Sequence, residues 1–313
     1  MRFASHFFAL MKQRLILSSA AISVLICLVA YLALVDLDIY AQRAISSAPA
    51  AKQSVSVIKN DDQYARYVGA ALQNKRLRSS LQWSFGGKTQ TGWDIYVPLI
   101  SYAIGTDSDP DSADFAVAIS KWQRRSGLDG TGVLDQATLE SFTKYWQSRR
   151  LGRGSLVATD SLLAAPINDF FDATRSPDLL QLEAETYAAY QRMIAAAAKD
   201  LQLKINSSGG LSANEKFLKI ISAYRSPAYQ ESLRKKEPNA GRTALATNSP
   251  HSTGHALDIY VGGEPVKTED SNRVLQVQTP AYKWLVKNAQ RFGFYPYFYE
   301  PWHWEYVPQK VNN

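Results

Sequence analysis

The most conspicuous pattern of hydrophobic positions is an apolar run near the N-terminus. Residues 15–35 (LILSSAAISVLICLVAYLALV) contain no charged side chain. As a helix this run extends about 31 Å, which matches the hydrocarbon core of a bilayer. We therefore predict a transmembrane anchor within residues 1–40.

The charges that flank this run indicate its orientation. Basic side chains precede it, whereas Asp36 and Asp38 follow it. Because positive flanks stay in the cytoplasm, we expect the chain beyond residue 38 to lie on the periplasmic side of the cytoplasmic membrane. A cleaved secretory signal, with Ala41 and Ala44 near the processing site, is the alternative. Both interpretations export the rest of the chain.

Two apolar stripes at helical spacing follow further along the chain. Residues 41–60 are polar, small and rich in Ser and Ala, which is typical of a tether. In residues 61–153 the stripes stand on either side of a glycine-rich turn, and they consist of Phe115, Ile119 and Trp122 and of Leu139, Phe142 and Trp146. Asp135 stands where it can cap the second helix. We predict a small helical domain over residues 61–153.

A cluster of positive charges ends this segment. Arg149, Arg150 and Arg153 stand beside Gly152 and Gly154. Such a run is most often solvated surface, and an anionic wall or membrane is the other surface that it suits. We predict a flexible, exposed junction here.

The rest of the chain, residues 165–313, mixes strand and helix patterns. Two short apolar stretches read as strands, at residues 217–223 and 256–261. An amphipathic helix is expected over residues 282–292, ending at Gly293. We predict an α+β fold in which a small antiparallel sheet is flanked by helices.

Composition and charge narrow the possible partners. The chain has 313 residues, 46% of them hydrophobic and 20% charged, which suits two modest folded domains. Its net charge of +7 suits an anionic environment. We predict no nucleic-acid partner, because no nucleic-acid-binding motif accompanies the charge. The single cysteine, Cys27, excludes an intramolecular disulfide framework.

Two short stretches near the C-terminus carry the residue types of a catalytic metal site: SPHSTGHALD and EPWH. A hydrolytic zinc site needs three protein ligands, an open position for water and a carboxylate that moves protons without binding the metal. His251, Asp258 and His303 fit the ligand positions. Glu300 fits the proton-transfer role. We therefore predict a Zn²⁺ cofactor.

The local patterns also predict how these side chains are placed. Alternation along the second strand puts Asp258 on the same face as Ala256, whose small side chain leaves room for a metal. Pro301 interrupts the last strand, which leaves Glu300 at the end of a loop near His303.

Other polar residues nearby receive different interpretations. We expect His255 to line the cleft without binding metal, and Glu305 to point outward from its strand. Arg225 directly follows a predicted strand, where a guanidinium group suits recognition of a carboxylate. Ser249 is better suited to fix the geometry of its loop than to act as a nucleophile.

The pattern S-x-H-x-x-G-x-A-x-D followed by E-x-W-H resembles the VanY-type D-alanyl-D-alanine carboxypeptidases, and the match covers roughly residues 180–308. These are zinc peptidases that act on peptidoglycan stem peptides. The resemblance implies that His251, Asp258 and His303 bind zinc and that Glu300 is the catalytic base.

The same resemblance implies a set of residues that contact the substrate. The element Tyr224-Arg225-Ser226 matches the family's Y-R-S element. Arg225 is then expected to stabilise the substrate or its oxyanion, and Gln230 and Ser249 are candidates for substrate contact.

The helical segment also resembles a known module, the peptidoglycan-binding domain found beside many wall hydrolases. The residues that carry this resemblance are Trp122-Gln123, Gly127-Leu128-Asp129-Gly130 through Gly132, and Ala137-Thr138-Leu139. A plain helical spacer is the alternative interpretation.

Together these patterns lead to three hypotheses about function. The first is a membrane-anchored D,D-carboxypeptidase that removes the terminal D-alanine of peptidoglycan stem peptides. The second is an endopeptidase or L,D-carboxypeptidase with the same zinc chemistry. The third is a wall-binding protein with a vestigial site.

Overall fold

The computed structural model describes residues 61–151, 161–236 and 249–308. Residues 62–313 form one compact unit. Within the three described ranges, no helix has both the length and the hydropathy needed to cross a bilayer. The predicted anchor and tether lie outside these ranges and stay predictions.

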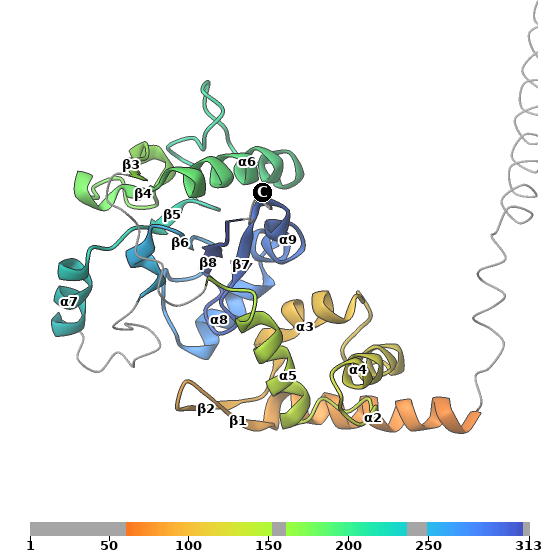
Figure 1. The fold of residues 1–313 in the computed structure, drawn as a ribbon. Helices are drawn as coiled ribbons and strands as arrows, with labels where there is room; N and C mark the ends of the chain where they lie inside the picture. The colour runs from red at the N-terminus through yellow and green to blue at the C-terminus, as the bar shows by residue number, and fades with distance from the viewer. Residues whose placement is uncertain (1–60, 152–160, 237–248, 309–313) are drawn as a thin grey trace, which may run out of the picture. The chain divides into compact units, whose positions relative to one another are not determined.

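The first part of this unit, residues 61–151, is called the helical region below (Figure 1). It consists of helices and one β-hairpin: α2 (Asp61–Ser80), β1 (Gln82–Phe85), β2 (Lys88–Thr91), the 3₁₀-helix η2 (Asp94–Tyr96), α3 (Val97–Ile104), α4 (Ala113–Arg125) and α5 (Gln136–Gln147). The two predicted helices are confirmed as α4 and α5. Ser112 caps α4 through the backbone N–H of Phe115, and Asp135 caps α5 through that of Thr138.

Side-chain amides hold the glycine-rich turn between α4 and α5 in place. The carboxamide of Gln123 donates to the carbonyl of Val133 at 2.8 Å and accepts from the N–H of Gly132 at 2.8 Å. Asn74 on α2 donates to the carbonyl of Gly132 at 2.9 Å and accepts from the N–H of Leu134 at 2.7 Å. These bonds satisfy buried backbone groups that the irregular turn leaves without helix or strand partners.

The second part, residues 161–308, is called the sheet region. Its strands are β3 (Leu162–Ala164), β4 (Gln181–Glu183), β5 (Ile220–Ser222), β6 (Ala256–Ile259), β7 (Phe294–Pro296) and β8 (His303–Tyr306). Its helices are η4 (Ile167–Asp169), η5 (Pro177–Leu179), α6 (Ala184–Leu201), α7 (Pro227–Lys236), η6 (Pro250–Thr253), α8 (Asp270–Gln278), α9 (Pro280–Asn288) and η7 (Ala289–Phe292). The predicted mixture of helices with small antiparallel sheets is confirmed.

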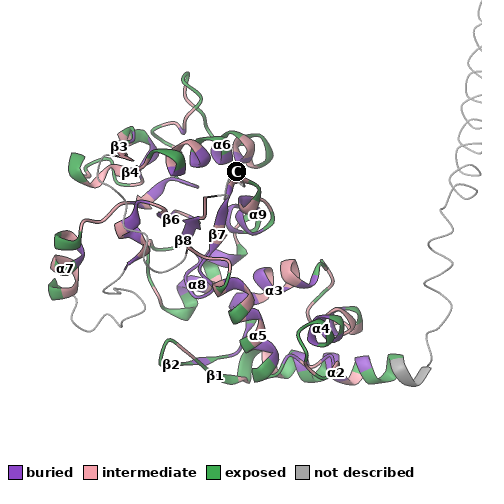
Figure 2. Ribbon diagram, in the orientation of Figure 1, coloured by how far each residue is buried: buried purple, intermediate pink, exposed green. Residues whose placement is uncertain are grey.

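The main sheet is antiparallel, with strand order β5-β6-β8-β7. Side chains alternate between its faces, and one face packs against α6 and α9. On that face Trp304 contacts Tyr282 of α9, and the hydroxyl of Tyr306 donates to Glu185 of α6 at 2.6 Å. Every residue of β6 and β8 is buried, so both faces of these central strands are covered (Figure 2).

Aromatic side chains join the helical region to the sheet region. Tyr96 stacks on Phe298 with ring centroids 4.5 Å apart, and Phe85 of the hairpin stacks on Tyr299 at 5.5 Å. The buried guanidinium of Arg273 donates to the hydroxyl of Tyr96 at 3.0 Å. The described parts of the two predicted domains therefore pack together, and their division at 61–153 and 165–313 stays a prediction.

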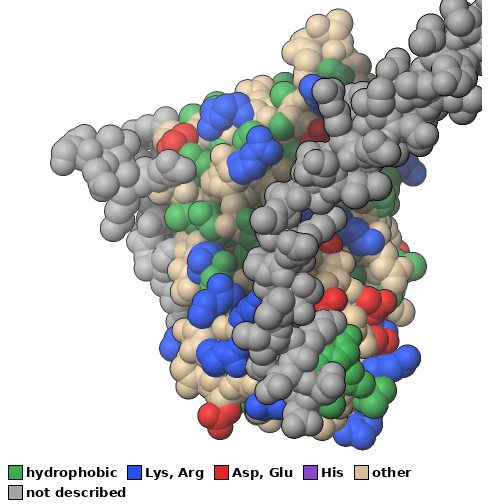
Figure 3. Space-filling view, turned by 90° about the vertical axis from the view of Figure 1, so that its right-hand side faces the viewer, with side chains coloured by type: hydrophobic (Ala, Val, Ile, Leu, Met, Phe, Trp, Pro, Cys, Tyr) green, Lys and Arg blue, Asp and Glu red, His purple; other side chains and the backbone are tan. Residues whose placement is uncertain are grey.

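Charged side chains are dispersed over the surface that Figure 3 presents. On that face Lys and Arg side chains stand among hydrophobic and polar ones, with Asp and Glu between them.

Candidate metal centre

The register of the sheet places two polar side chains next to each other. Asp258 on β6 pairs directly with His303 on β8, and on its other side it pairs with Ser222 on β5. Directly opposed residues of an antiparallel pair have side chains about 4.5–5.5 Å apart at Cβ. The pairing of β6 with β8 therefore brings together two residues that are 45 positions apart in the sequence.

A third polar side chain comes from the short helix η6. Ser249 caps this helix by accepting from the N–H of His251 at 3.3 Å, and Gly254 ends it with a φ of 75°. A Cβ atom at Gly254 would lie 3.0 Å from the backbone nitrogen of Glu183, so both the conformation and the space favour glycine. This cap fixes the loop, as the sequence predicted for Ser249.

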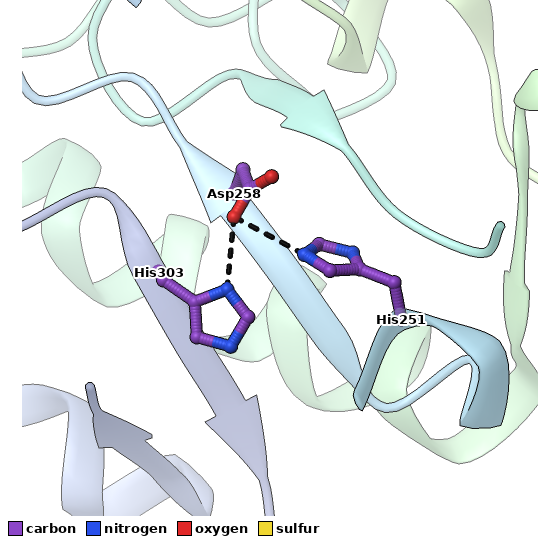
Figure 4. A group of neighbouring side chains, drawn as sticks. All are labelled: His251, Asp258 and His303. Carbon is purple, nitrogen blue, oxygen red and sulfur yellow. Dashed lines mark hydrogen bonds and ion pairs between the residues drawn. The ribbon is translucent and has the colours of Figure 1, made fainter. Parts of the chain in front are cut away.

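Three ligand atoms converge around one carboxylate oxygen (Figure 4). Nε2 of His251 lies 3.2 Å from Oδ1 of Asp258, and Nδ1 of His303 lies 3.0 Å from the same oxygen. Tetrahedral zinc with bonds of about 2.0–2.1 Å separates its ligand atoms by about 3.3 Å. The two distances between histidine and aspartate therefore suit a zinc ion, and all three ligand atoms lie within 4.8 Å of one another.

Hydrogen bonds behind His251 determine which of its nitrogens is free. Its Nδ1 lies 2.7 Å from the carbonyl oxygen of Ala223, which can only accept, so Nδ1 carries the proton. Nε2 then presents a lone pair toward Asp258 and makes no hydrogen bond of acceptable geometry. A buried lone pair that faces a carboxylate needs a cation between them, which supports the metal site.

The electrostatics of two of the three ligands point in the same direction. Burial, and then the positive charge of Arg225, lower the pKa of His251 to about 4, so that the ring is neutral and able to bind metal near pH 7. Burial alone would raise the pKa of Asp258, but His251, His303 and Arg225 together hold it well below its ordinary value. Asp258 is therefore a carboxylate. Burial alone would lower the pKa of the third ligand, His303, but its bonds to Asp258 and Glu305 raise it to about 9, so this ring gives up a proton when it binds a metal.

Glu300 lies in the turn before β8, as the sequence predicted from Pro301. Its carbonyl accepts from the N–H of His303 at 3.0 Å, and its side chain is buried. Burial raises its pKa to about 7, opposed by the charges of His303 and Arg225 and reinforced by that of Asp258. A carboxyl group with such a pKa can both take and give a proton near neutrality.

Arg225 follows β5 and closes the site from the side opposite His303. Its Nη2 donates to Oδ2 of Asp258 at 2.6 Å, and its Nε donates to Ser222 at 3.0 Å. Gln230 on α7 is buried and accepts from Nη1 of Arg225 at 3.4 Å. Both residues thus stand beside the candidate ligands, and their predicted contact with a substrate stays a prediction.

His255 lies apart from the three candidate ligands. Its Nδ1 is 2.7 Å from the hydroxyl of Thr186 at the start of α6, and it is 3.5 Å from Glu183. The cluster that can hold a metal among the described residues contains His251, Asp258 and His303. His255 is not part of this cluster, and the expectation that it lines the cleft stays a prediction.

Glu305 is the clearest departure from the sequence-based expectations. The prediction of an outward side chain is wrong, because Glu305 is fully buried and its Oε1 lies 3.1 Å from Nε2 of His303. In the sheet it pairs with Ala256, whose small side chain we expected to make room for a metal. Alternation along β8 was the available signal, since residues 303 and 305 share a face.

Arg150 is the second residue whose role at the site the sequence did not predict. It was expected in an exposed junction, but its guanidinium group forms an ion pair with Glu305 and lies over the ring of Tyr297. Burial alone would raise the pKa of Glu305, whereas its bond to His303 and the charges of His303 and Arg150 lower it to about 2. Glu305 is therefore an anion in contact with a candidate metal ligand.

A comparison with protein families agrees with this arrangement. The model of the VanY family, described as D-alanyl-D-alanine carboxypeptidase, matches residues 179–309. Residues 179–309 are a VanY domain. The resemblance that the two C-terminal motifs indicated is thereby confirmed, and the VanY domain contains all three candidate ligands together with Glu300.

The chain is also similar to parts of solved structures. The LdcB LD-carboxypeptidase matches at 24% identity over 50% of this chain and 73% of its own, with a TM-score of 0.36. The vancomycin-resistance D,D-pentapeptidase VanY in complex with Zn(II) matches at 22% identity over 41% of this chain and 74% of its own, with a TM-score of 0.28. VanYB in complex with D-alanine-D-alanine matches at 22% over 41% and 72%, with a TM-score of 0.27. No curated protein matches the chain.

Proposed function

We propose that this protein is a zinc-dependent D-alanyl-D-alanine carboxypeptidase that removes the terminal D-alanine of peptidoglycan stem peptides. The observation that carries the proposal is the convergence of His251 Nε2, Asp258 Oδ1 and His303 Nδ1 inside a VanY domain. The family description supplies the class of substrate.

The donor set of this site favours zinc over harder cations. Two imidazole nitrogens and one carboxylate oxygen suit Zn²⁺, whereas Mg²⁺ and Ca²⁺ prefer sites made of oxygen atoms. With three protein ligands, a fourth position is left for water or substrate. When bound here, zinc acidifies a water molecule and polarises the carbonyl of the scissile bond.

The side chains around the ligands supply the remaining chemistry. Glu300, whose pKa burial raises to about 7, is placed to take a proton from the attacking water and to deliver it to the leaving amine. Arg225 holds Asp258 through one nitrogen and carries the positive charge that offsets a developing oxyanion or binds the terminal carboxylate of the peptide.

The location of the enzyme is part of the proposal and depends on the sequence alone. The apolar run at residues 15–35 supports anchoring in the cytoplasmic membrane, with the VanY domain outside the cytoplasm. Substrate at the cell wall is then within reach of the domain, and the resemblance of residues 61–153 to a wall-binding module is in keeping with this placement.

Digestion of defined muropeptides tests the proposed reaction. Full-length protein in detergent is incubated with pentapeptide and tetrapeptide muropeptides and with cross-linked dimers, with and without a chelator, and the products are read by mass spectrometry. We expect the loss of one alanine from the pentapeptide, abolished by the chelator and restored by Zn²⁺. Loss from the tetrapeptide identifies an L,D-carboxypeptidase, and cleavage of the dimer identifies an endopeptidase. No cleavage of any substrate with zinc bound would refute the proposal.

A further inference from the structure

In the two histidines of the candidate metal centre, the ring nitrogens that face away from Asp258 have different hydrogen-bond partners. Nδ1 of His251 faces a backbone carbonyl, that of Ala223, at 2.7 Å. Nε2 of His303 faces a carboxylate, that of Glu305, at 3.1 Å. Each contact leaves the opposite nitrogen of the ring directed at Asp258.

Glu305 is in turn held by the end of the helical region. Its Oε1 accepts from Arg150 as well as from His303, and its Oε2 accepts from the backbone N–H of Leu151 at 2.9 Å. Arg150 and Leu151 lie shortly after the end of α5, 155 and 154 positions before Glu305 in the sequence. A series of hydrogen bonds therefore connects the helical region to a candidate metal ligand.

The arginine is itself fixed on both sides. Its Nη1 donates to the side chain of Gln147 on α5 at 3.0 Å, and its guanidinium carbon lies 4.1 Å from the centre of the Tyr297 ring. Tyr297 also packs edge-on against His303, with ring centroids 5.8 Å apart. The guanidinium group is thus immobilised between α5 and the segment that leads to Glu300.

We propose that Glu305 is a positioning residue for the metal centre and that Arg150 of the helical region holds it in place. A carboxylate behind a metal-binding histidine fixes the orientation and tautomer of the ring and makes the other nitrogen a better donor. Here Glu305 accepts from Nε2, so Nδ1 is the nitrogen that would give up its proton to a metal beside Asp258. The helical region is then a determinant of zinc affinity in the VanY domain.

Physical chemistry explains why the arginine is needed. A fully buried carboxylate costs several kcal/mol in lost hydration unless charges and hydrogen-bond donors compensate it. Two donors from the helical region and one from His303 surround Glu305. Without Arg150, Glu305 loses one of these three donors, and its position behind His303 is less firmly fixed.

Zinc affinity, measured by competition with a chromophoric chelator on the full-length protein, tests this proposal. We expect Glu305→Gln to weaken zinc binding by about 10–100-fold, the loss typical of removing a partner behind a metal ligand. Arg150→Gln, which leaves Glu305 in place, is expected to weaken binding in the same direction but less. Arg149→Gln is the matched control, because Arg149 lies over Tyr145 and bonds to its carbonyl. Its zinc affinity is expected to equal that of the wild type.

Two further measurements separate positioning from a general loss of structure. The thermal unfolding of the metal-free variants reports any structural damage, and the visible absorption spectrum of the Co²⁺ form reports the ligand geometry. Reduced zinc affinity together with an altered Co²⁺ spectrum supports the proposal. Wild-type affinity in both Glu305→Gln and Arg150→Gln overturns it, even if their thermal stability is lower. If Glu305→Gln does not fold, Arg150→Gln decides alone.

The proposal rests on the proposed function only through the metal. A wild-type protein that binds no zinc would refute the metal centre and both proposals together. A wild-type protein that binds zinc and cleaves muropeptides, with variants of unchanged affinity, would refute the role of Glu305 and Arg150 alone.

Discussion

The helical region and the sheet region bury very different kinds of polar groups. In the described part of the helical region, the buried polar side chains are neutral amides and hydroxyls: Asn74, Gln90, Ser120, Gln123 and Thr138. The sheet region buries ionisable groups as well: Asp169, Lys219, His251, Asp258, Arg273, Glu300, His303 and Glu305. All of the first set except Gln90 bond to the backbone of the irregular turn between α4 and α5, whereas much of the second set converges on the metal centre.

The neutral buried groups mainly stabilise the fold, whereas many of the charged buried groups are suited to chemistry at the metal centre. A neutral amide that bonds to buried backbone groups stabilises the fold at little cost. A buried charge costs several kcal/mol and is retained where pairing or function compensates it. Five of the ionisable groups lie in or beside the metal centre, so we expect their substitution to affect activity more than folding: His251, Asp258, Glu300, His303 and Glu305.

The largest expected effect is that of Glu300→Gln. The amide keeps the shape of the side chain but cannot carry a proton, so we expect kcat to fall by about 10²–10⁴-fold. Zinc affinity is expected to stay unchanged, because Glu300 is outside the set of three ligand residues. Steady-state cleavage of a pentapeptide muropeptide and the metal content of the purified variant are the measurements. A kcat within a few-fold of the wild type would exclude Glu300 as the proton carrier.

An intermediate effect, on folding alone, is expected for Gln123→Ala. This change removes the amide that serves the carbonyl of Val133 and the N–H of Gly132, so the free energy of unfolding should fall by about 2–3 kcal/mol. Urea denaturation of the metal-free protein measures the loss. Gln136→Ala is the control, since Gln136 is exposed and bonds only to Glu140 among the contacts described.

The contrast between the two regions would be refuted if Gln123→Ala lowered the free energy of zinc binding as much as it lowered the free energy of unfolding. We expect its zinc affinity to match the wild type, because the bonds of Gln123 lie within the turn between α4 and α5 and reach none of the candidate ligands. Chelator competition on the folded variant measures this.

The smallest expected effect concerns His255, an ionisable residue of the sheet region outside the metal centre. Burial lowers its pKa, opposed by the charges of Glu183 and Glu185. Below about pH 6.5 the unfolded chain therefore binds a proton that the folded chain resists, and the folded state loses stability as the pH falls.

Replacement by glutamine should remove this contribution. We expect the difference in unfolding free energy between His255→Gln and the wild type to change by less than about 1.4 kcal/mol per pH unit between pH 7.5 and 5.5, in favour of the variant at the lower pH. Chemical denaturation at several pH values checks it. A difference that is constant over this range would show that His255 does not titrate on unfolding.

The sequence predicted the candidate ligands because their identity is a matter of residue type and spacing. His251, Asp258, His303 and Glu300 stand in two compact motifs, and the structure brings the three ligand residues together. Helices α4 and α5 were also predictable, since their apolar stripes and the cap at Asp135 are local features. Local patterns of this kind survive folding because they determine which face of an element is buried.

The residues behind the ligands could be identified only from the tertiary structure. The sequence predicted that Glu305 points outward from its strand, whereas in the structure both faces of β8 are covered. The sequence indicated that Arg150 lies on the solvated surface, because its partner Glu305 is 155 positions away. The burial of a charge and the identity of its partner depend on how distant elements pack, and no local pattern encodes that packing. The sequence by itself therefore determined the candidate metal ligands, whereas the tertiary structure decided which side chains hold those ligands in place.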